Sequence, residues 1–200
     1  ANTLALANDA TNAANIAAIN AATGTVTVTG TATAAQATRL AAYTKPVVYD
    51  VADVSAGVTA STVSAAALNE ARNITVSSGT TTATQAATIM AATNSGTTTI
   101  ARVDGTAAEV LALTLGANDR ITALNVTTPT VSILDAAAIN AKDTGDNIGT
   151  VTFLTVTGTA ADVLANLTTA SLAEKVVVTG TVSVAQAVAL QAADALDGNT

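Results

Sequence analysis

A short phrase of the sequence recurs near both ends of the chain, as TGTATAAQA from Thr29 and as TGTVSVAQA from Thr179. Two further segments align with it, and the alignment places one polar residue of each segment in a single column, at intervals of about fifty residues. A fixed period constrains the fold more than local propensity does, because each repeat must build the same small unit. The column holds Gln36, Gln85, Asp135 and Gln186.

A second set of related segments lies between the members of the first. IARVDGTAAEVLALTL from Ile100 matches FLTVTGTAADVLANL from Phe153, and the segment from Val47 is a divergent member. The building block is therefore about half the long period, near ~25 residues. We interpret residues 1–200 as a single repeat array with a helical half-unit over residues 1–24, and with further units that begin near residues 25, 47, 74, 98, 121, 151 and 176.

Each unit starts with a run in which β-branched residues alternate with Thr or Ser, as Val26 and Val28 do in the first unit. This period of two predicts a strand with one buried face. An Ala-rich run follows, whose apolar residues have a spacing of three that predicts a helix of about three turns. The expected stripes are Ala34, Ala37 and Leu40; Ala83, Ala86 and Ile89; Ile133, Ala136 and Ile139; and Val184, Ala187 and Leu190.

The junction between strand and helix carries a Ser or Thr, followed three residues later by Gln, Glu or Asp. This spacing predicts a capping box, in which the hydroxyl accepts from an amide of the first turn and the longer side chain reaches back to the cap amide. We therefore interpret the recurring glutamine as scaffold rather than as a ligand-binding residue. The expected pairs are Thr33 with Gln36, Thr82 with Gln85, Thr106 with Glu109, Ser132 with Asp135, Thr159 with Asp162, and Ser183 with Gln186.

Strands that alternate with short helices predict an α/β fold in which parallel strands are joined by right-handed crossovers. The favoured architecture is a β/α solenoid of strand-helix units with one parallel sheet and Thr on its open face. The alternative is a closed parallel β/α barrel. Neither end of the chain shows a polar cap, so we expect self-association or contact with adjacent repeats of a longer chain.

The composition excludes several classes of function. With no Cys and no His, the chain lacks thiolate ligands, disulfides and the commonest general base. The net charge is −7 and the seven Lys and Arg are scattered, so we expect no nucleic-acid partner. No apolar run is long enough to span a membrane. We predict that the chain is not an enzyme and binds no cofactor, with Ca²⁺ as the only ion considered.

The turn KDTGDNIGT from Lys142 is the candidate for Ca²⁺, because Asp143, Asp146 and Asn147 supply oxygen ligands. An ordinary solvated turn is the favoured interpretation, since the segment matches no EF-hand loop. Two further pairs lie at strand ends, where an enzyme of this topology keeps its site. We interpret them, too, as solvated loop charges: Asp50 with Asp53, and Arg102 with Asp104.

Regular rows of Thr on a solenoid face can bind ice, and Thr25, Thr27 and Thr29 form one such row. Strict alternation places Arg102, Leu124 and Leu154 at corresponding outward positions, which would interrupt the rows. Tyr43 and Tyr49 are too few to form a platform for carbohydrate stacking.

The phrases VTVTGTATAAQATRLAA and TAADVLANL resemble the Ala/Thr-rich repeats of very large secreted surface proteins of bacteria, including cyanobacteria. The resemblance covers nearly the whole chain, in composition and in loose repeat phrasing. It implies an extracellular structural role at the bacterial cell surface, in a fibre, a surface layer or an adhesin stalk, through stacking of units. The alternative is an ice- or glycan-binding module displayed on the Thr-rich face.

Overall fold

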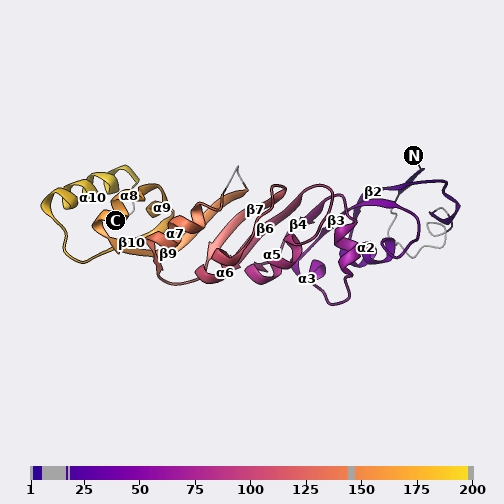
Figure 1. Ribbon diagram of the computed structural model, residues 1–200, viewed down its shortest axis with the longest axis horizontal. Coiled ribbons are helices and arrows are strands. Elements are labelled where there is room, and N and C mark those ends of the chain that lie inside the picture. The colour runs from indigo at the N-terminus through magenta and orange to yellow at the C-terminus, as the bar shows by residue number, and fades with distance from the viewer. Residues whose placement is uncertain (1, 6–16, 18, 144–146, 198–200) are drawn as a thin grey trace.

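The computed structural model describes residues 2–5, 17, 19–143 and 147–197, which form an elongated α/β molecule (Figure 1). Strands and helices alternate along the chain as the sequence predicts. Their bounds are β1 (Asn2–Ala5), β2 (Val26–Ala32), α2 (Ala34–Leu40), β3 (Val47–Asp53), α3 (Ser55–Val58), α4 (Ala65–Asn69), β4 (Ile74–Val76), β5 (Thr81–Thr82), α5 (Ala83–Met90), β6 (Thr98–Gly105), α6 (Ala107–Ala112), β7 (Asp119–Val126), β8 (Val131–Ser132), α7 (Ile133–Asn140), β9 (Ile148–Thr159), α8 (Ala160–Ala165), α9 (Leu167–Ala170), β10 (Ala173–Thr179) and α10 (Val184–Asp197).

The strands form one ten-stranded sheet, in which all the described pairs are parallel. Its main path follows chain order, β1-β2-β3-β4-β6-β7-β9-β10, while the short β5 and β8 pair with β6 and β9. The α/β class with a parallel sheet and intervening helices is thus confirmed. A closed barrel is wrong, because the two ends of this path, β1 and β10, do not pair within the described part of the chain.

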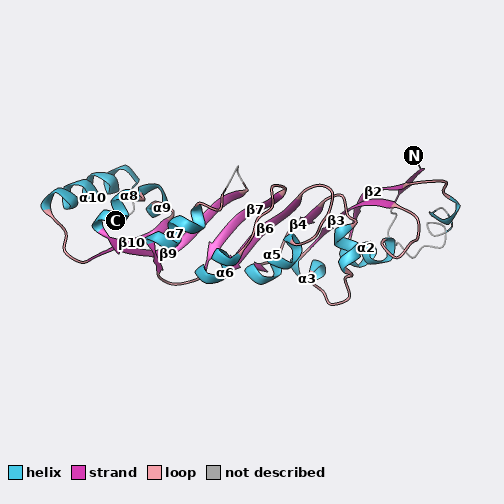
Figure 2. Ribbon diagram, in the orientation of Figure 1, coloured by secondary structure: helices cyan, strands magenta, loops and turns pink. Residues whose placement is uncertain are grey.

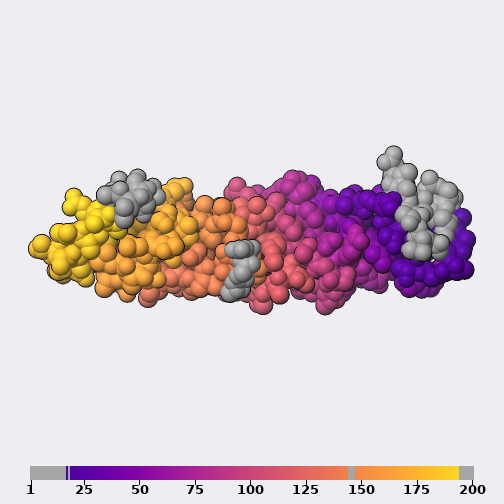
Figure 3. Space-filling view, turned by 90° about the horizontal axis from the view of Figure 1, so that it is seen from above, coloured from indigo at the N-terminus to yellow at the C-terminus, as the bar shows by residue number. Residues whose placement is uncertain are grey.

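The helices lie in a row along the sheet (Figure 2). Helix α2 contacts β3, α5 contacts β6 and α7 contacts β9, so each of these helices covers the strand that follows it in the chain. This offset is what a right-handed crossover between neighbouring parallel strands produces. The space-filling view shows the resulting long, narrow body (Figure 3).

The core lies between the helix row and the sheet and consists mainly of small aliphatic side chains. The predicted stripes of α2, α5 and α7 are buried, and every one of their residues is at most 1% exposed. The fourth stripe differs: α10 forms, but Val184 is 83% exposed and Leu190 is only partly buried. The spacing of three predicted the helix correctly. The burial of its stripe depends, in addition, on a neighbouring strand against which the helix can pack.

Two equivalent glycines show how closely the helices approach the sheet. A Cβ atom on Gly105 would lie 2.6 Å from the Cβ of Ala83, and one on Gly158 would lie 2.5 Å from Cγ2 of Ile133. Ala83 and Ile133 begin the helices α5 and α7, so both glycines face the first turn of the preceding helix. Any larger residue would push that helix away from the sheet.

The strands do not alternate strictly, and this corrects one sequence-based assignment. Two successive residues without full burial occur at 101–102 in β6, at 122–123 in β7 and at 149–150 in β9. Arg102 pairs with Ala123 and Ala123 with Thr150, so the three strands change phase in register. Leu124 is consequently 1% exposed and faces the core, and its assignment to the open face was wrong. The pairing offset stays constant across these positions, so no residue is inserted into any one strand, and we call this shared change of phase at 101–102, 122–123 and 149–150 the bend.

The predicted capping boxes form at the start of four of the described helices. In each of them the Ser or Thr and the third residue after it exchange hydrogen bonds. At α2, the Thr33 amide donates to Oε1 of Gln36 over 2.9 Å, and the Gln36 amide donates to Oγ1 of Thr33 over 3.2 Å. The same two bonds occur at α5, α6 and α10, in Thr82 with Gln85, Thr106 with Glu109, and Ser183 with Gln186.

The two Asp members of this series cap differently. Asp135 and Asp162 accept from the cap hydroxyls of Ser132 and Thr159, over 2.8 and 2.6 Å, while their amides donate back to those hydroxyls. Asp is one methylene shorter than Glu, so its carboxylate meets the hydroxyl instead of the cap amide. Its charge still favours the positive end of the helix.

The N-terminal half-unit differs from the expected helix at its start. Asn2–Ala5 form β1, which pairs with β2 from Asn2 beside Val26 to Ala5 beside Thr29. A four-residue run gives too short an alternation to identify a strand from sequence. Residues 6–16 and 18 of the half-unit lie outside the described residues.

We expect Gly158→Ala to lower the free energy of unfolding by about 1–3 kcal/mol, because the new methyl group overlaps Ile133. Urea denaturation measures the loss. In an Ile133→Ala background the same substitution should cost less, since the overlapping atom is gone. Equal losses in both backgrounds would contradict the close packing of α7 on the sheet.

We expect Thr82→Ala to lower the free energy of unfolding by about 1 kcal/mol, because an amide in the first turn of α5 loses its acceptor. Thr88→Ala is the matched control, since Thr88 is exposed in the same helix and bonds only the carbonyl of Thr84 among the described contacts. Its effect should stay within about 0.5 kcal/mol. If the two variants melt alike, the capping box contributes nothing to stability.

Candidate functional site

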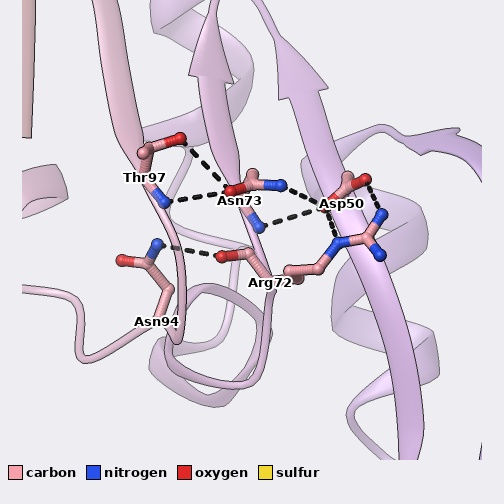
Figure 4. Close-up of polar contacts among 5 residues, drawn as sticks. All are labelled: Asp50, Arg72, Asn73, Asn94 and Thr97. Atoms are coloured by element: carbon pink, nitrogen blue, oxygen red, sulfur yellow. Dashed lines mark hydrogen bonds and ion pairs between the residues drawn. The ribbon is translucent and has the colours of Figure 1, made fainter. Parts of the chain in front are cut away.

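Polar side chains gather at the edge of the sheet where the strands begin. Because the strands are parallel, the residues that precede them lie at one edge. Asn73 precedes β4 and Thr97 precedes β6, while Asp50 lies within β3, one residue before β3 starts to pair with β4. Figure 4 shows these residues together with Arg72 and Asn94, and we call the five the edge network.

Asp50 is the acceptor at one end of the edge network. Its Oδ1 accepts from Nε of Arg72 over 2.9 Å and its Oδ2 from Nη2 over 2.5 Å, which makes a two-pronged ion pair. The same Oδ1 accepts from the side-chain amide of Asn73 over 2.9 Å. The Asp50 carboxylate therefore joins β3 to the residues just before β4.

Asn73 extends the edge network to the next strand. Its Oδ1 accepts from the Thr97 amide over 2.9 Å and from the Thr97 hydroxyl over 3.2 Å. Asn94 donates in turn to the Arg72 carbonyl over 3.3 Å. Each member thus has a partner in a neighbouring unit, and the arrangement links the middle of β3 to the starts of β4 and β6 (Figure 4).

The electrostatics of the edge network favour the ionised carboxylate. The hydrogen bonds from Arg72 lower the pKa of Asp50 below its ordinary value, partial burial opposes this, and the bonds from Asn73 add to the lowering. A carboxylate with a lowered pKa is a poor general base near neutral pH. The network is therefore suited to holding structure together rather than to proton transfer.

A similar arrangement near β7 and β9 involves two residues of the Ca²⁺ candidate, Asn147 and Asp143. Nη1 of Arg120 donates to Oδ1 of Asn147 over 2.6 Å, and Asn147 is 4% exposed. Oδ1 of Asp143 accepts from the Ile148 amide over 2.9 Å. A guanidinium bound to the amide oxygen disfavours a cation there, so Asn147 is a structural residue. Asp146 lies outside the described residues.

The other charged candidates also have structural partners, and they lie in strands rather than in solvated loops. Asp53, the last residue of β3, accepts from the Ala34 amide over 3.0 Å at the start of α2. Arg102 and Asp104 in β6 form an ion pair with distances of 2.7 and 3.0 Å, and Arg102 lowers the pKa of Asp104. Asp50 and Asp53 thus bond different partners and form no acid-base pair with each other.

Several hollows on the surface of the described part of the chain could receive a ligand, among them one of about 390 Å³ beside Asn140, Asp143 and Thr152. A groove of about 500 Å³ lies beside α3, α4 and α5, and its described lining is uncharged, including Val58, Leu68, Thr88 and Ala92. A smaller hollow of about 220 Å³ lies at the bend, lined by Arg102, Ala123, Asn125, Thr150 and Thr152 together with the core-facing residue Leu124. In the described part of the chain, no three acidic side chains are grouped as a metal site would require.

Tyr49 lies in the core and not on the surface. Tyr49 is buried, its hydroxyl donates to the Ala67 carbonyl over 3.0 Å, and burial raises its pKa. It therefore belongs to the core and to no ligand platform. None of the described helices has the length and apolar character needed to cross a bilayer.

No protein-family model matches the chain, and no curated protein or solved structure is significantly similar to it. The geometry described above is therefore the basis for assigning a role. Sequence analysis missed the edge network, although one signal was available. Asn73 and Asn147 each precede an Ile that starts a strand, which places a short amide at the same edge twice.

We expect Asp50→Asn to lower the melting temperature at pH 7 by roughly 2–4 °C, because the charge opposite Arg72 is lost. The lowered pKa of Asp50 means that its contribution is complete above about pH 4, the ordinary value, and disappears as the pH falls through the lowered value. The difference between variant and wild type should therefore shrink at pH 2–3.

Differential scanning calorimetry over this pH range provides the measurement for Asp50→Asn. Arg72→Lys serves as a comparison, since it keeps the positive charge but loses the two-pronged geometry. A difference between Asp50→Asn and wild type that stays constant down to pH 2 would show that the carboxylate charge does not stabilise the fold.

Proposed function

We propose that this chain is a structural segment of an extracellular repeat protein at the bacterial cell surface. In this proposal its units form a β/α solenoid and contribute, by stacking, to a fibre, a surface layer or an adhesin stalk. The proposal includes no catalytic role and no nucleic-acid partner.

One observation carries the proposal: the same packing arrangement recurs from unit to unit. Neighbouring strands pair in chain order, and α2, α5 and α7 each cover the strand that follows. Each unit therefore buries the strand edge and the helix stripe of its neighbour, as in repeat proteins whose stability is a sum of unit and interface terms. Such an array grows in length without a change of core, which suits a spacer or a fibre.

The polar chemistry of the chain supports the same role. Asp50, Asp53 and Asn147 bond to backbone amides or to guanidinium groups inside the fold. Gln85 caps α5 and also donates to the Thr59 hydroxyl over 3.2 Å, so it ties two helical segments together. Side chains that a ligand site would need are thus engaged in holding units to one another.

Immunogold electron microscopy with an antibody against this chain tests the proposal on cells that produce it. We expect label outside the cell, on ordered filaments or sheets. Label confined to the cytoplasm, or on dispersed compact particles, would overturn the proposal. Cells from which the gene has been deleted serve as the control for antibody specificity.

The hollow at the bend favours a second candidate function, the binding of a glycan on the open sheet face. Arg102, Asn125 and Thr152 bring a cation, an amide and a hydroxyl to this hollow, a set that suits sugar hydroxyls. Ice binding is less favoured, because the register places Thr75 and Thr99 beside Ala52 and Arg120 in one row. A glycan array separates this candidate from the structural role.

A further inference from the structure

Among the described residues, α10 has no following strand of the kind that α2, α5 and α7 cover. The stripes of α2, α5 and α7 are buried over β3, β6 and β9. Helix α10 follows β10, the last strand of the sheet, and packs against α8. On this helix, Val184 of the stripe is 83% exposed and the nearby Val188 is 61% exposed, while Leu190 at the other end of the stripe packs partly against the core.

The side of β10 that faces away from β9 has no strand paired to it among the described residues, and α10 follows this strand in the chain. Among the described residues, β10 pairs with β9 alone, and its central residues Val176, Val177 and Val178 are only partly buried. Inward residues of internal strands, such as Val103 and Val126, are completely buried. One further parallel strand beside β10 and beneath α10 would cover both the free strand edge and the exposed helix stripe.

The opposite end of the molecule offers such a strand. Among the described residues, β1 pairs with β2 alone, and its principal contact is with that strand. The following strands β3, β6 and β9 each lie under the helix of the preceding unit. Among the described residues, β1 thus has no helix of a preceding unit over it, and α10 has no strand of a following unit beneath it.

Resting on the proposed structural role, we propose that the face formed by β10 and the α10 stripe binds β1 of a second copy of this chain. Figure 1 places β1 and α10 at opposite ends of the molecule. Because all described strand pairs are parallel, β1 can add to β10 with the polarity of the internal pairs. The contact is head to tail, so it leaves a free face at each end of the assembly and generates a filament unless the rotation between copies closes a ring.

Sedimentation velocity of the 200-residue chain over a range of concentrations tests this proposal. We expect species larger than a dimer, whose share grows with concentration. With a net charge of −7 on each copy and an apolar contact, added salt should favour association. A chain that remains monomeric at millimolar concentration and physiological salt would overturn the proposal.

The double variant Val184→Asp with Val188→Asp places two charges on the proposed face. Both side chains are exposed in the single chain, so folding should be retained, and circular dichroism checks this. Burying these charges should weaken association at least about tenfold. Leu134→Asp is the matched control, because Leu134 is 59% exposed on the internal helix α7 and should leave association unchanged. Equal association of the double variant and wild type would overturn the proposal.

A mixing experiment identifies which ends meet. The double variant retains β1, so it should add to the free β10 end of wild-type chains, stop their growth and shorten them in proportion to its amount. If β10 instead paired with β10 of a second copy, wild type would stop at a dimer and the variant would leave it unaffected. That result would contradict the head-to-tail contact.

The outcomes also separate this proposal from the proposed function. Filaments of the isolated chain, together with label inside cells, would support the contact and overturn the surface role. Label at the cell surface, together with an isolated chain that stays monomeric, would support the surface role and overturn the contact.

Discussion

The short distance between the helix row and the sheet is the constraint on which the rest of the structure depends. Ala83, Ala86 and Ile133 face the sheet from the helices, and Gly105 and Gly158 leave no side chain beneath the first turns. Small residues allow the helices to approach the sheet closely. Because of this short distance, even Ala and Gly make enough contacts to stabilise the fold. Aromatic residues make up only 2% of the chain, and small aliphatic side chains therefore fill most of the core around the buried rings of Tyr49 and Phe153.

Hydrogen bonds that join neighbouring units complement this core. A weakly charged chain with small side chains specifies register poorly by packing alone, since one Ala-rich face resembles the next. The side chains of Asp53, Asn73 and Gln85 each bond a group in an adjacent segment, over distances near 3 Å. Such bonds are short-ranged and directional, so they select one alignment of the units from several that pack almost equally well.

The sequence predicted the repeating parts of the fold better than its ends. Period two at Val26 and period three at Ala34 identified a strand and a helix, because both patterns report burial within one unit. The cap residues were found for the same reason, as their bonds span only three positions. Leu124 was misplaced because the burial of β7 changes phase at residues 122–123, and the same change occurs at the paired positions of β6 and β9.

The edge network shows the same limit. Asp50 and Arg72 lie far apart in the sequence and meet only because β3 and β4 pair in one register. The exposure of Val184 could not be read from its helix either, because it depends on the absence of a strand beneath α10 among the described residues. Local patterns therefore predicted the units, while contacts between units required the structure.

The in-register bend gives the open face of the sheet a crease that runs across successive strands. Arg102, Ala123 and Thr150 occupy equivalent positions along it, and none of them belongs to the buried core. Substitution at these positions leaves the helix-facing side untouched, so surface chemistry and scaffold can vary independently in an array of this kind. Successive units would then present a line of exchangeable groups at intervals of about 4.8 Å, the spacing between neighbouring strands.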